Sequence, residues 1–279
     1  MIAIRISRGL GVAALVMAAA CNSLDIQNPN APDAARALAD PNTIESVAAG
    51  TMRTWFDAYT KYEAAGVLET QAKSYSSSWN NGNMNFYSSI DNPNDPPAQW
   101  TRMQTPRSWQ NDPASSARTS VDAYWEGVPG SGVGGMYTAL SSANDALTAI
   151  RTNKLVIRDA PSTKRAETIA AFIQGAALMV IALEYDKGYM VDENTNLTTL
   201  QYSNRAVMRD SAVSKLQQAA ALAAANTFTT LPDWAHGISY TNVQIAQIAN
   251  TMAAMTLAYW PRDNTEIAKV DWAKVASLA

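Results

Sequence analysis

The side chains best suited to nucleophilic or zinc chemistry are few in this chain. Its 279 residues hold one cysteine, Cys21, and one histidine, His236. A cysteine nucleophile needs a base beside it, and a zinc site needs three or four protein ligands. A single residue of each type, far apart in the sequence, is poor support for either. We therefore expect no catalytic cysteine, no metal and no cofactor, and we expect His236 to lie in a loop.

A glycine-rich segment, GSGVGG at 130–135, has the spacing of a dinucleotide-binding loop. The acid Asp159 follows at about the distance at which such sites bind the ribose. Such a loop must follow a buried strand, but Pro129 directly precedes the first glycine, and proline cannot donate to a sheet ladder. Nothing after Asp159 continues a βα alternation. The sequence therefore favours a loop between two helices over a nucleotide site.

A second polar segment, 192–203, begins like a calcium-binding loop. Asp192, Asn194 and Asn196 occupy the first, third and fifth positions of such a loop. Leu197 replaces the glycine needed for the sharp turn, and Ser203 replaces the glutamate that binds calcium with both oxygens. The segment is therefore predicted to be a polar loop.

The segment 76–120 is rich in Ser, Asn, Pro, Asp and aromatic residues and has no sustained period. A long irregular segment inside a compact domain is usually functional or disordered, and disordered segments are poor in aromatics. Tryptophan and tyrosine rings can stack on the apolar faces of sugars, while amides bind the hydroxyl groups. The same rings could instead pack the loop onto helices or contact a partner. The candidate ligand-binding residues are Trp79, Asn80, Tyr87, Trp100 and Trp109.

Residues 1–20 have the pattern of an export signal. Arg5 and Arg8 precede an apolar run, GLGVAALVMAAA, that is too short for a membrane span of about 20 residues. The following Ala-Ala-Cys resembles the lipobox of bacterial lipoproteins, in which the signal is cut before a cysteine that is then acylated. At the third position before the cysteine, Ala18 replaces the leucine that is usual in a lipobox. We predict Cys21 as the lipidation site; the alternative is an ordinary signal that leaves Cys21 free or removes it.

The composition indicates a globular protein that does not bind nucleic acid. Hydrophobic residues make up 47% and charged residues 16%, and the formal net charge is −3. Removing residues 1–20 takes away two arginines and no acid, which leaves 19 basic and 24 acidic residues and a net charge of −5. An acidic chain is poorly suited to phosphate backbones. No Asp or Glu stands out in an apolar context that would raise its pKa, although a pair of acids for glycoside hydrolysis could be far apart in sequence.

The mature chain is predicted to consist of a lipid-anchored tether over 21–40 and an all-α domain over 41–279. The tether is polar and broken by prolines, and a helix begins at Pro41 with Asp40 as its N-cap. The only short strand candidate is KLVIRD at 154–159. The other expected helices cover 62–75, 136–150, 169–183, 209–226 (ending near Asn226), 242–260 and 271–279.

Apolar residues at helical spacing indicate which helix faces lie in the core. The stripes are Ile44, Val47, Ala48, Met52, Trp55 and Tyr59; Met136, Leu140, Ala143, Leu147 and Ile150; Ile169, Phe172, Ile173, Ala176, Val180 and Leu183; and Ile245, Ile248, Met252, Met255 and Tyr259.

Three stretches together resemble the SusD/RagB family of nutrient-uptake lipoproteins of Gram-negative outer membranes. The start of the mature chain has the family's Cys, Leu-Asp and Asn-Pro order, followed by a helix that carries Gly50. The stretch MYTALSSANDALTAI is similar to a family helix with a tyrosine and an Ala-Asn pair, here Tyr137 and Asn144. The stretch FIQGAALMVIALEYDKGYMVDE resembles the helix that carries Gly175 and ends in an aromatic-rich turn.

The resemblance implies a tetratricopeptide-like scaffold of helical hairpins and binding without catalysis. Such proteins lie on the outer-membrane surface over a TonB-dependent transporter resembling SusC, and they capture glycans or peptides and deliver them to it. The family continues considerably further at the C-terminus, so the chain is expected to be truncated there. The alternatives are a helical-repeat scaffold lipoprotein for protein partners and a secreted hydrolase.

Overall fold

The computed structural model describes residues 34–60, 125, 127–128 and 133–279. The chain divides into two units, Met1–Arg36 and Ala37–Ala279. A short helix, α2 (Ala34–Ala37), lies at the sequence boundary between them, and every other element belongs to the second unit. The predicted helix over 62–75 and the whole aromatic segment 76–120 fall outside the described residues, as do Cys21 and the export signal.

Helices make up most of the described residues, which confirms the predicted all-α class. The long helices are α3 (Pro41–Thr60), α8 (Met136–Leu147), α9 (Ala160–Glu184), α10 (Arg205–Ala225) and α11 (Asn242–Tyr259). The shorter helical segments are η4 (Thr148–Thr152), η5 (Leu197–Thr199), η6 (Pro232–Trp234), α12 (Asn264–Ile267) and α13 (Trp272–Leu278). The strands are β1 (Gly127–Val128), β2 (Val133–Gly134), β3 (Lys187–Tyr189) and β4 (Tyr202–Asn204).

Helix α3 begins where the sequence predicts. The Asp40 carboxylate accepts a hydrogen bond from the backbone N–H of Thr43 at 3.2 Å and from its hydroxyl at 2.7 Å. These bonds satisfy N–H groups that have no partner inside the helix. The bond to the Thr43 side chain is the main reason why the pKa of Asp40 is lowered. Asp40 is therefore the predicted N-cap, and Pro41 is the first helical residue.

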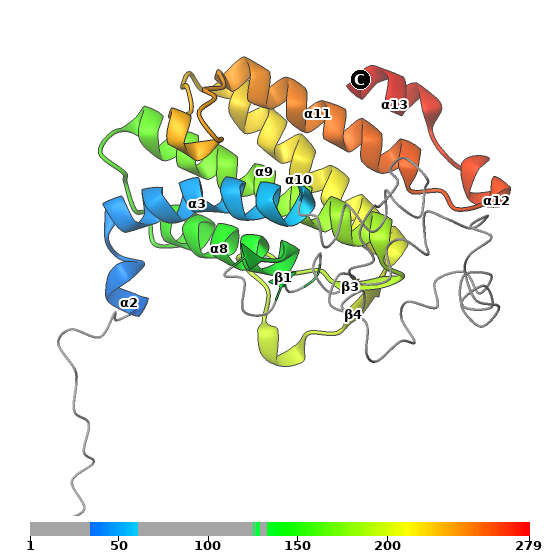
Figure 1. Ribbon diagram of the computed structural model, residues 1–279, viewed down its shortest axis with the longest axis horizontal. Helices are drawn as coiled ribbons and strands as arrows, with labels where there is room; N and C mark the ends of the chain where they lie inside the picture. Colours follow the sequence, from blue (N-terminus) through cyan, green and yellow to red (C-terminus); the bar gives the residue numbers. More distant parts are fainter. Residues whose placement is uncertain (1–33, 61–124, 126, 129–132) are drawn as a thin grey trace, which may run out of the picture. The chain divides into compact units, whose positions relative to one another are not determined.

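Helix α9 is the centre of the fold, with α3, α8, α10 and α11 packed against it (Figure 1). Nearly every residue from Ala166 to Ala182 is buried on all sides, so the helix shows no single apolar stripe. Its length and mean hydropathy of 1.8 would suit a membrane span, but 94% of that window is buried inside the protein. These values are those of a core helix surrounded by other helices.

The predicted stripe of α8 is confirmed, and that of α11 is partly wrong. Met136, Leu140, Ala143 and Leu147 are buried in α8, and Ile150 is buried in the π-helical turn η4 that follows it. In α11 the stripe fails at Tyr259, which is 66% exposed. The buried face of α11 is rotated towards small residues that allow close helix packing. Its members are Ile245, Ala249, Met252, Ala253, Ala254 and Thr256.

Residues 154–159 form a loop, so the only strand candidate in the sequence does not form a strand. Lys154 and Arg158 have positive φ angles of 58° and 42°, which interrupt an extended chain. Ile157 is fully buried, and its N–H donates to the Thr163 hydroxyl at 2.8 Å. Asp159 caps α9 by accepting from the Ser162 N–H at 2.7 Å. The segment therefore serves as the entry to the central helix.

Part of the glycine-rich segment, β2, is one strand of a two-stranded pair. Strands β1 and β2 pair antiparallel, with Gly127 opposite Gly134 and Val128 opposite Val133. A dinucleotide-binding loop connects a strand of a parallel sheet to a helix, so this local pairing does not provide the required setting. The expectation of a simple loop between helices is corrected, because β2 lies directly before α8.

A buried ion pair joins α3 to α9. Arg165 donates to the Glu45 carboxylate at 2.6 Å, and only 11% and 10% of the two side chains are exposed. Arg158 binds the same carboxylate oxygen at 2.5 Å. Arg165 also donates to the Thr229 carbonyl at 3.2 Å and lies over the Trp234 ring. Arg165 therefore links three segments of the chain: α3 through Glu45, its own helix α9, and the segment after α10 through Thr229.

Helices α9 and α10 approach each other closely at Gly175. A Cβ atom at this position would lie 2.6 Å from the Leu216 Cγ and 2.7 Å from the Leu216 backbone nitrogen. Both distances are shorter than ordinary van der Waals contact, so only glycine fits without movement of α10. This explains in physical terms why a glycine stands in the middle of an otherwise apolar helix.

Candidate functional site

The largest aromatic cluster of the described residues gathers around Trp125. Its ring centroid lies 4.6 Å from that of Tyr137, 5.1 Å from Tyr185 and 6.0 Å from Tyr189. The Tyr202 ring lies 6.3 Å from Trp125 and stacks on Tyr189 at 4.2 Å. We call these five residues the aromatic platform. They come from four places in the chain: the segment before β1, helix α8, the end of α9, and the β3–β4 pair.

The β3–β4 pair places two rings of the platform side by side. Tyr189 and Tyr202 are opposite each other in the antiparallel register. Gly188 lets β3 lie directly on the helices, because a Cβ there would be 2.5 Å from Ile181 and 2.9 Å from Met208. Sequence analysis missed both strands. Their three-residue length leaves no alternation to detect, and the close approach at Gly188 is a tertiary contact.

The Tyr137 hydroxyl fixes the backbone of β3. It accepts a hydrogen bond from the Tyr189 N–H at 2.6 Å and donates to the Tyr189 carbonyl at 3.2 Å. Burial raises the pKa of Tyr137, so its hydroxyl keeps its proton at neutral pH and remains a donor. A hydrogen bond with Tyr202 raises the pKa of Tyr189 as well. The phenols of Tyr137 and Tyr189 are therefore neutral.

The loop between β3 and β4 is tied down by ion pairs. The Glu193 carboxylate accepts from Arg151 at 2.7 Å and from Gln174 at 2.8 Å, and Lys215 lies 3.8 Å away. Lys215 also pairs with Asp192 at 2.9 Å. These contacts join the loop to η4, α9 and α10. They limit how far Tyr189 and Tyr202 can move.

The carboxylates of this loop are stabilised in their charged form. Desolvation would raise the pKa of Glu193, but hydrogen bonds from Gln174 and Arg151 outweigh it and hold the pKa below its ordinary value. The pKa of Glu167 on α9 is lowered in the same way. Desolvation would raise this pKa, but hydrogen bonds from Lys164 and Arg151 outweigh desolvation. Asp192 accepts from the Asn194 N–H and the Thr195 hydroxyl. The segment that begins like a calcium loop is thus a polar loop, as predicted.

A shallow hollow of about 420 Å³ opens beside the platform on α8. Trp125, Tyr137, Thr138, Ser141 and Ser142 line it. An indole ring next to several hydroxyl groups offers one apolar face and several groups that donate and accept hydrogen bonds. None of these five lining residues carries a charge. The hollow therefore suits a neutral ligand with both apolar faces and hydroxyl groups.

The residues predicted from sequence cannot be compared with this hollow. Cys21, Trp79, Asn80, Tyr87, Trp100 and Trp109 all lie outside the described residues, so their roles stay predictions. His236 lies in the loop after η6, as expected, where its ring is close to Phe56 and its Nε2 is 3.5 Å from the Asp57 carboxylate. Within the described ranges, no three His, Cys, Asp or Glu residues lie close enough together to hold a metal ion.

Sequence analysis did not select Trp125, Tyr185, Tyr189 or Tyr202 as site residues. A partial signal exists, since tyrosines stand on both sides of the polar stretch 192–199. Comparison with known proteins adds nothing to the assignment: no family model, no curated protein and no solved structure matches the chain.

Proposed function

We propose that this protein is a surface lipoprotein of the outer membrane that captures glycans or other oligomeric nutrients. It would pass them to a TonB-dependent transporter resembling SusC and perform no catalysis itself. The observation that carries the proposal is the aromatic platform with its neutral, hydroxyl-lined hollow. Stacked rings bind the apolar faces of sugars, and nearby hydroxyl groups bind sugar hydroxyls.

The packing of the helices supports a hairpin scaffold of the SusD/RagB type. Helix α9 packs along α10, α10 along α11, and α11 along α13, so consecutive helices are neighbours. Such stacking is typical of helical-repeat proteins. Together with the lipobox-like Ala-Ala-Cys sequence at Cys21, it favours an anchored binding protein built from paired helices.

Ligand capture is tested first with the mature protein lacking lipid. Neutral oligosaccharides of several linkage types are screened by isothermal titration calorimetry, and at least one is expected to bind. A complete absence of binding across the panel, together with recovery of a partner that is not a membrane barrel, would favour the helical-repeat scaffold instead.

Delivery to a transporter is tested in cells that carry the lipidated protein. Mild detergent extraction is expected to recover a large β-barrel partner, and Cys21→Ala is expected to release the protein from the membrane fraction. Retention of the Cys21→Ala variant in the membrane would refute the predicted anchor, and extraction without any barrel would refute the predicted partner.

The hydrolase alternative can be tested at acids with a raised pKa. Desolvation raises the pKa of Asp145 in α8 and of Glu184 at the end of α9. At Glu184 the effect is opposed by Arg262, and the residue is exposed. This corrects the expectation that no acid would show a raised pKa. A general acid needs such a shift, but also a second carboxylate near the substrate. Turnover of an oligosaccharide that is lost in Glu184→Gln would replace the binding proposal with a hydrolase.

A further inference from the structure

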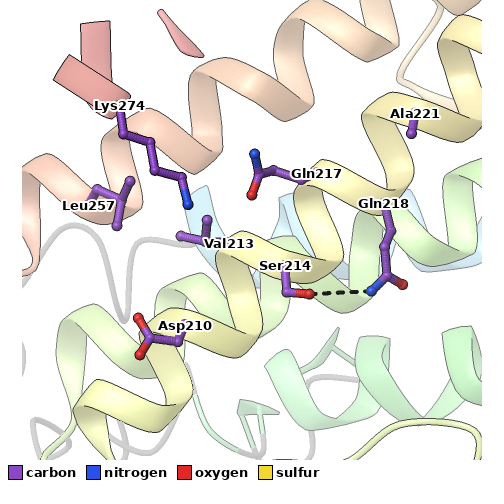
Figure 2. A pocket seen from close by; sticks show the side chains of 8 residues that line it. All are labelled: Asp210, Val213, Ser214, Gln217, Gln218, Ala221, Leu257 and Lys274. Atoms are coloured by element: carbon purple, nitrogen blue, oxygen red, sulfur yellow. Dashed lines mark hydrogen bonds between the residues drawn. The ribbon is translucent and has the colours of Figure 1, made fainter. Parts of the chain in front are cut away.

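A second hollow, which shares no lining residue with the platform, lies between α10 and the pair α11–α13 (Figure 2). Its volume of about 530 Å³ falls in the range of small-ligand sites. One wall is a stripe of α10 and the other is formed by Leu257 and Lys274. The stripe comprises Asp210, Val213, Ser214, Gln217, Gln218 and Ala221. We call this hollow the α10 groove.

The two charged residues of the groove are not equivalent. The Asp210 carboxylate is paired with the neighbouring Arg209 guanidinium at 2.8 Å, which offsets its charge. The ammonium group of Lys274 has no hydrogen-bond or ion-pair partner among the described residues. Figure 2 shows the Lys274 side chain reaching down into the groove, so that its end lies beside Val213 and faces Gln217. The groove therefore presents one uncompensated positive charge.

Uncharged donors also line the groove. Ser214 accepts a hydrogen bond from the Gln218 side chain at 3.3 Å, so its hydroxyl proton is available to a ligand. The Gln217 carboxamide has no partner among the described residues and supplies two further N–H donors. An ammonium group, an amide and a hydroxyl together form a donor set for a carboxylate. Val213 and Leu257 offer an apolar floor for the atoms that carry it.

We propose that the α10 groove binds the carboxylate of a short oligomer, with Lys274 as its ionic partner and Gln217 and Ser214 as hydrogen-bond donors. A single ammonium group balances a monoanion such as a carboxylate, whereas a dianionic phosphate monoester would require more positive charge than the groove contains. The carboxylate could belong to a uronic acid or to the end of a peptide. This site does not rest on the proposed function, because it uses none of the platform residues.

The experiment uses two probes, each with a neutral twin, on the mature unlipidated chain. One pair is trigalacturonic acid and its methyl ester, and the other is an N-acetylated glycine–serine tetrapeptide with a free or an amidated C-terminus. At least one acid is expected to bind about fivefold or more tightly than its twin. Lys274→Met is expected to remove this preference, Lys274→Arg to keep it, and added salt to weaken it.

The matched control is Lys269→Met, which removes the same charge from an exposed lysine that does not line the groove. It is expected to leave binding unchanged. The acid that binds more tightly than its neutral twin shows whether the groove recognises a uronic acid or the C-terminus of a peptide. The proposal is overturned if neither acid binds better than its neutral twin, or if Lys274→Met binds the acid as tightly as the natural chain.

Discussion

Replacing Gly175 by alanine should destabilise the protein, although alanine is the better helix former. The new Cβ would lie 2.7 Å from the Leu216 backbone nitrogen, about 0.7 Å inside ordinary contact. Because a backbone atom cannot rotate away, α10 must shift against the central helix. Overpacking of this kind costs about 1–3 kcal/mol, and the backbone contact places it near the upper end. Improved helix propensity returns about 1 kcal/mol, which leaves a net loss of about 2 kcal/mol.

Gly50→Ala is the matched control, since Gly50 also lies inside a long helix. A Cβ at Gly50 meets no atom of the described residues within 4 Å, so the change should stabilise the protein by about 0.5–1 kcal/mol. Thermal unfolding followed by circular dichroism is the assay, with about 2–4 °C expected for each kcal/mol. We expect Gly175→Ala to lower the midpoint by about 4–8 °C and Gly50→Ala to raise it slightly. A Gly175→Ala variant as stable as Gly50→Ala would refute the close packing of α9 on α10.

Three further predictions concern the contacts that hold the fold and the platform. Glu45→Ala should cost about 3–5 kcal/mol in urea unfolding, because it leaves Arg165 buried without its partner, and the double variant with Arg165→Ala should cost less than the sum. Folding lowers the pKa of Glu193, so the contribution of this carboxylate to stability is complete above the ordinary glutamate pKa of 4.5 and is lost as the pH falls through the folded pKa. Between about pH 6 and pH 3 the natural chain should therefore lose more stability than Glu193→Gln. Equal losses would contradict the role of this ion pair. Tyr137→Phe should cost about 1–3 kcal/mol and speed hydrogen exchange at the Tyr189 amide, which loses its acceptor; unchanged exchange would contradict the contact.

Local signals in the sequence predicted the parts of the fold that depend on neighbouring residues. The Asp40 cap, the start at Pro41 and the core face of α8 follow from side chains within one or two turns of each other. The end of α10 at Asn226 is confirmed for the same reason. These features need no knowledge of what the helix packs against.

Features set by distant contacts were missed. The buried face of α11 includes several of its alanines, whereas the apolar stripe in the sequence predicted that Tyr259 would be buried. Residues 154–159 look like a strand because three apolar residues follow one another, but the cap at Asp159 and the burial of Ile157 make them a helix entry. The aromatic platform could not be predicted, because Trp125 and Tyr202 are brought together only when the short β3–β4 pair lies on α8 and α9.

The central claim is that the Trp125 platform captures a neutral oligosaccharide, and one titration tests it most directly. An oligosaccharide that binds in the screen is titrated into the natural chain, into Trp125→Ala and into Trp272→Ala, which removes an exposed tryptophan of α13. A sugar face on Trp125 that removes about 100 Å² of apolar surface from water contributes about 2.5 kcal/mol. We therefore predict that Trp125→Ala weakens binding about tenfold or more while Trp272→Ala leaves it unchanged. Equal affinity of the natural chain and Trp125→Ala would contradict the claim.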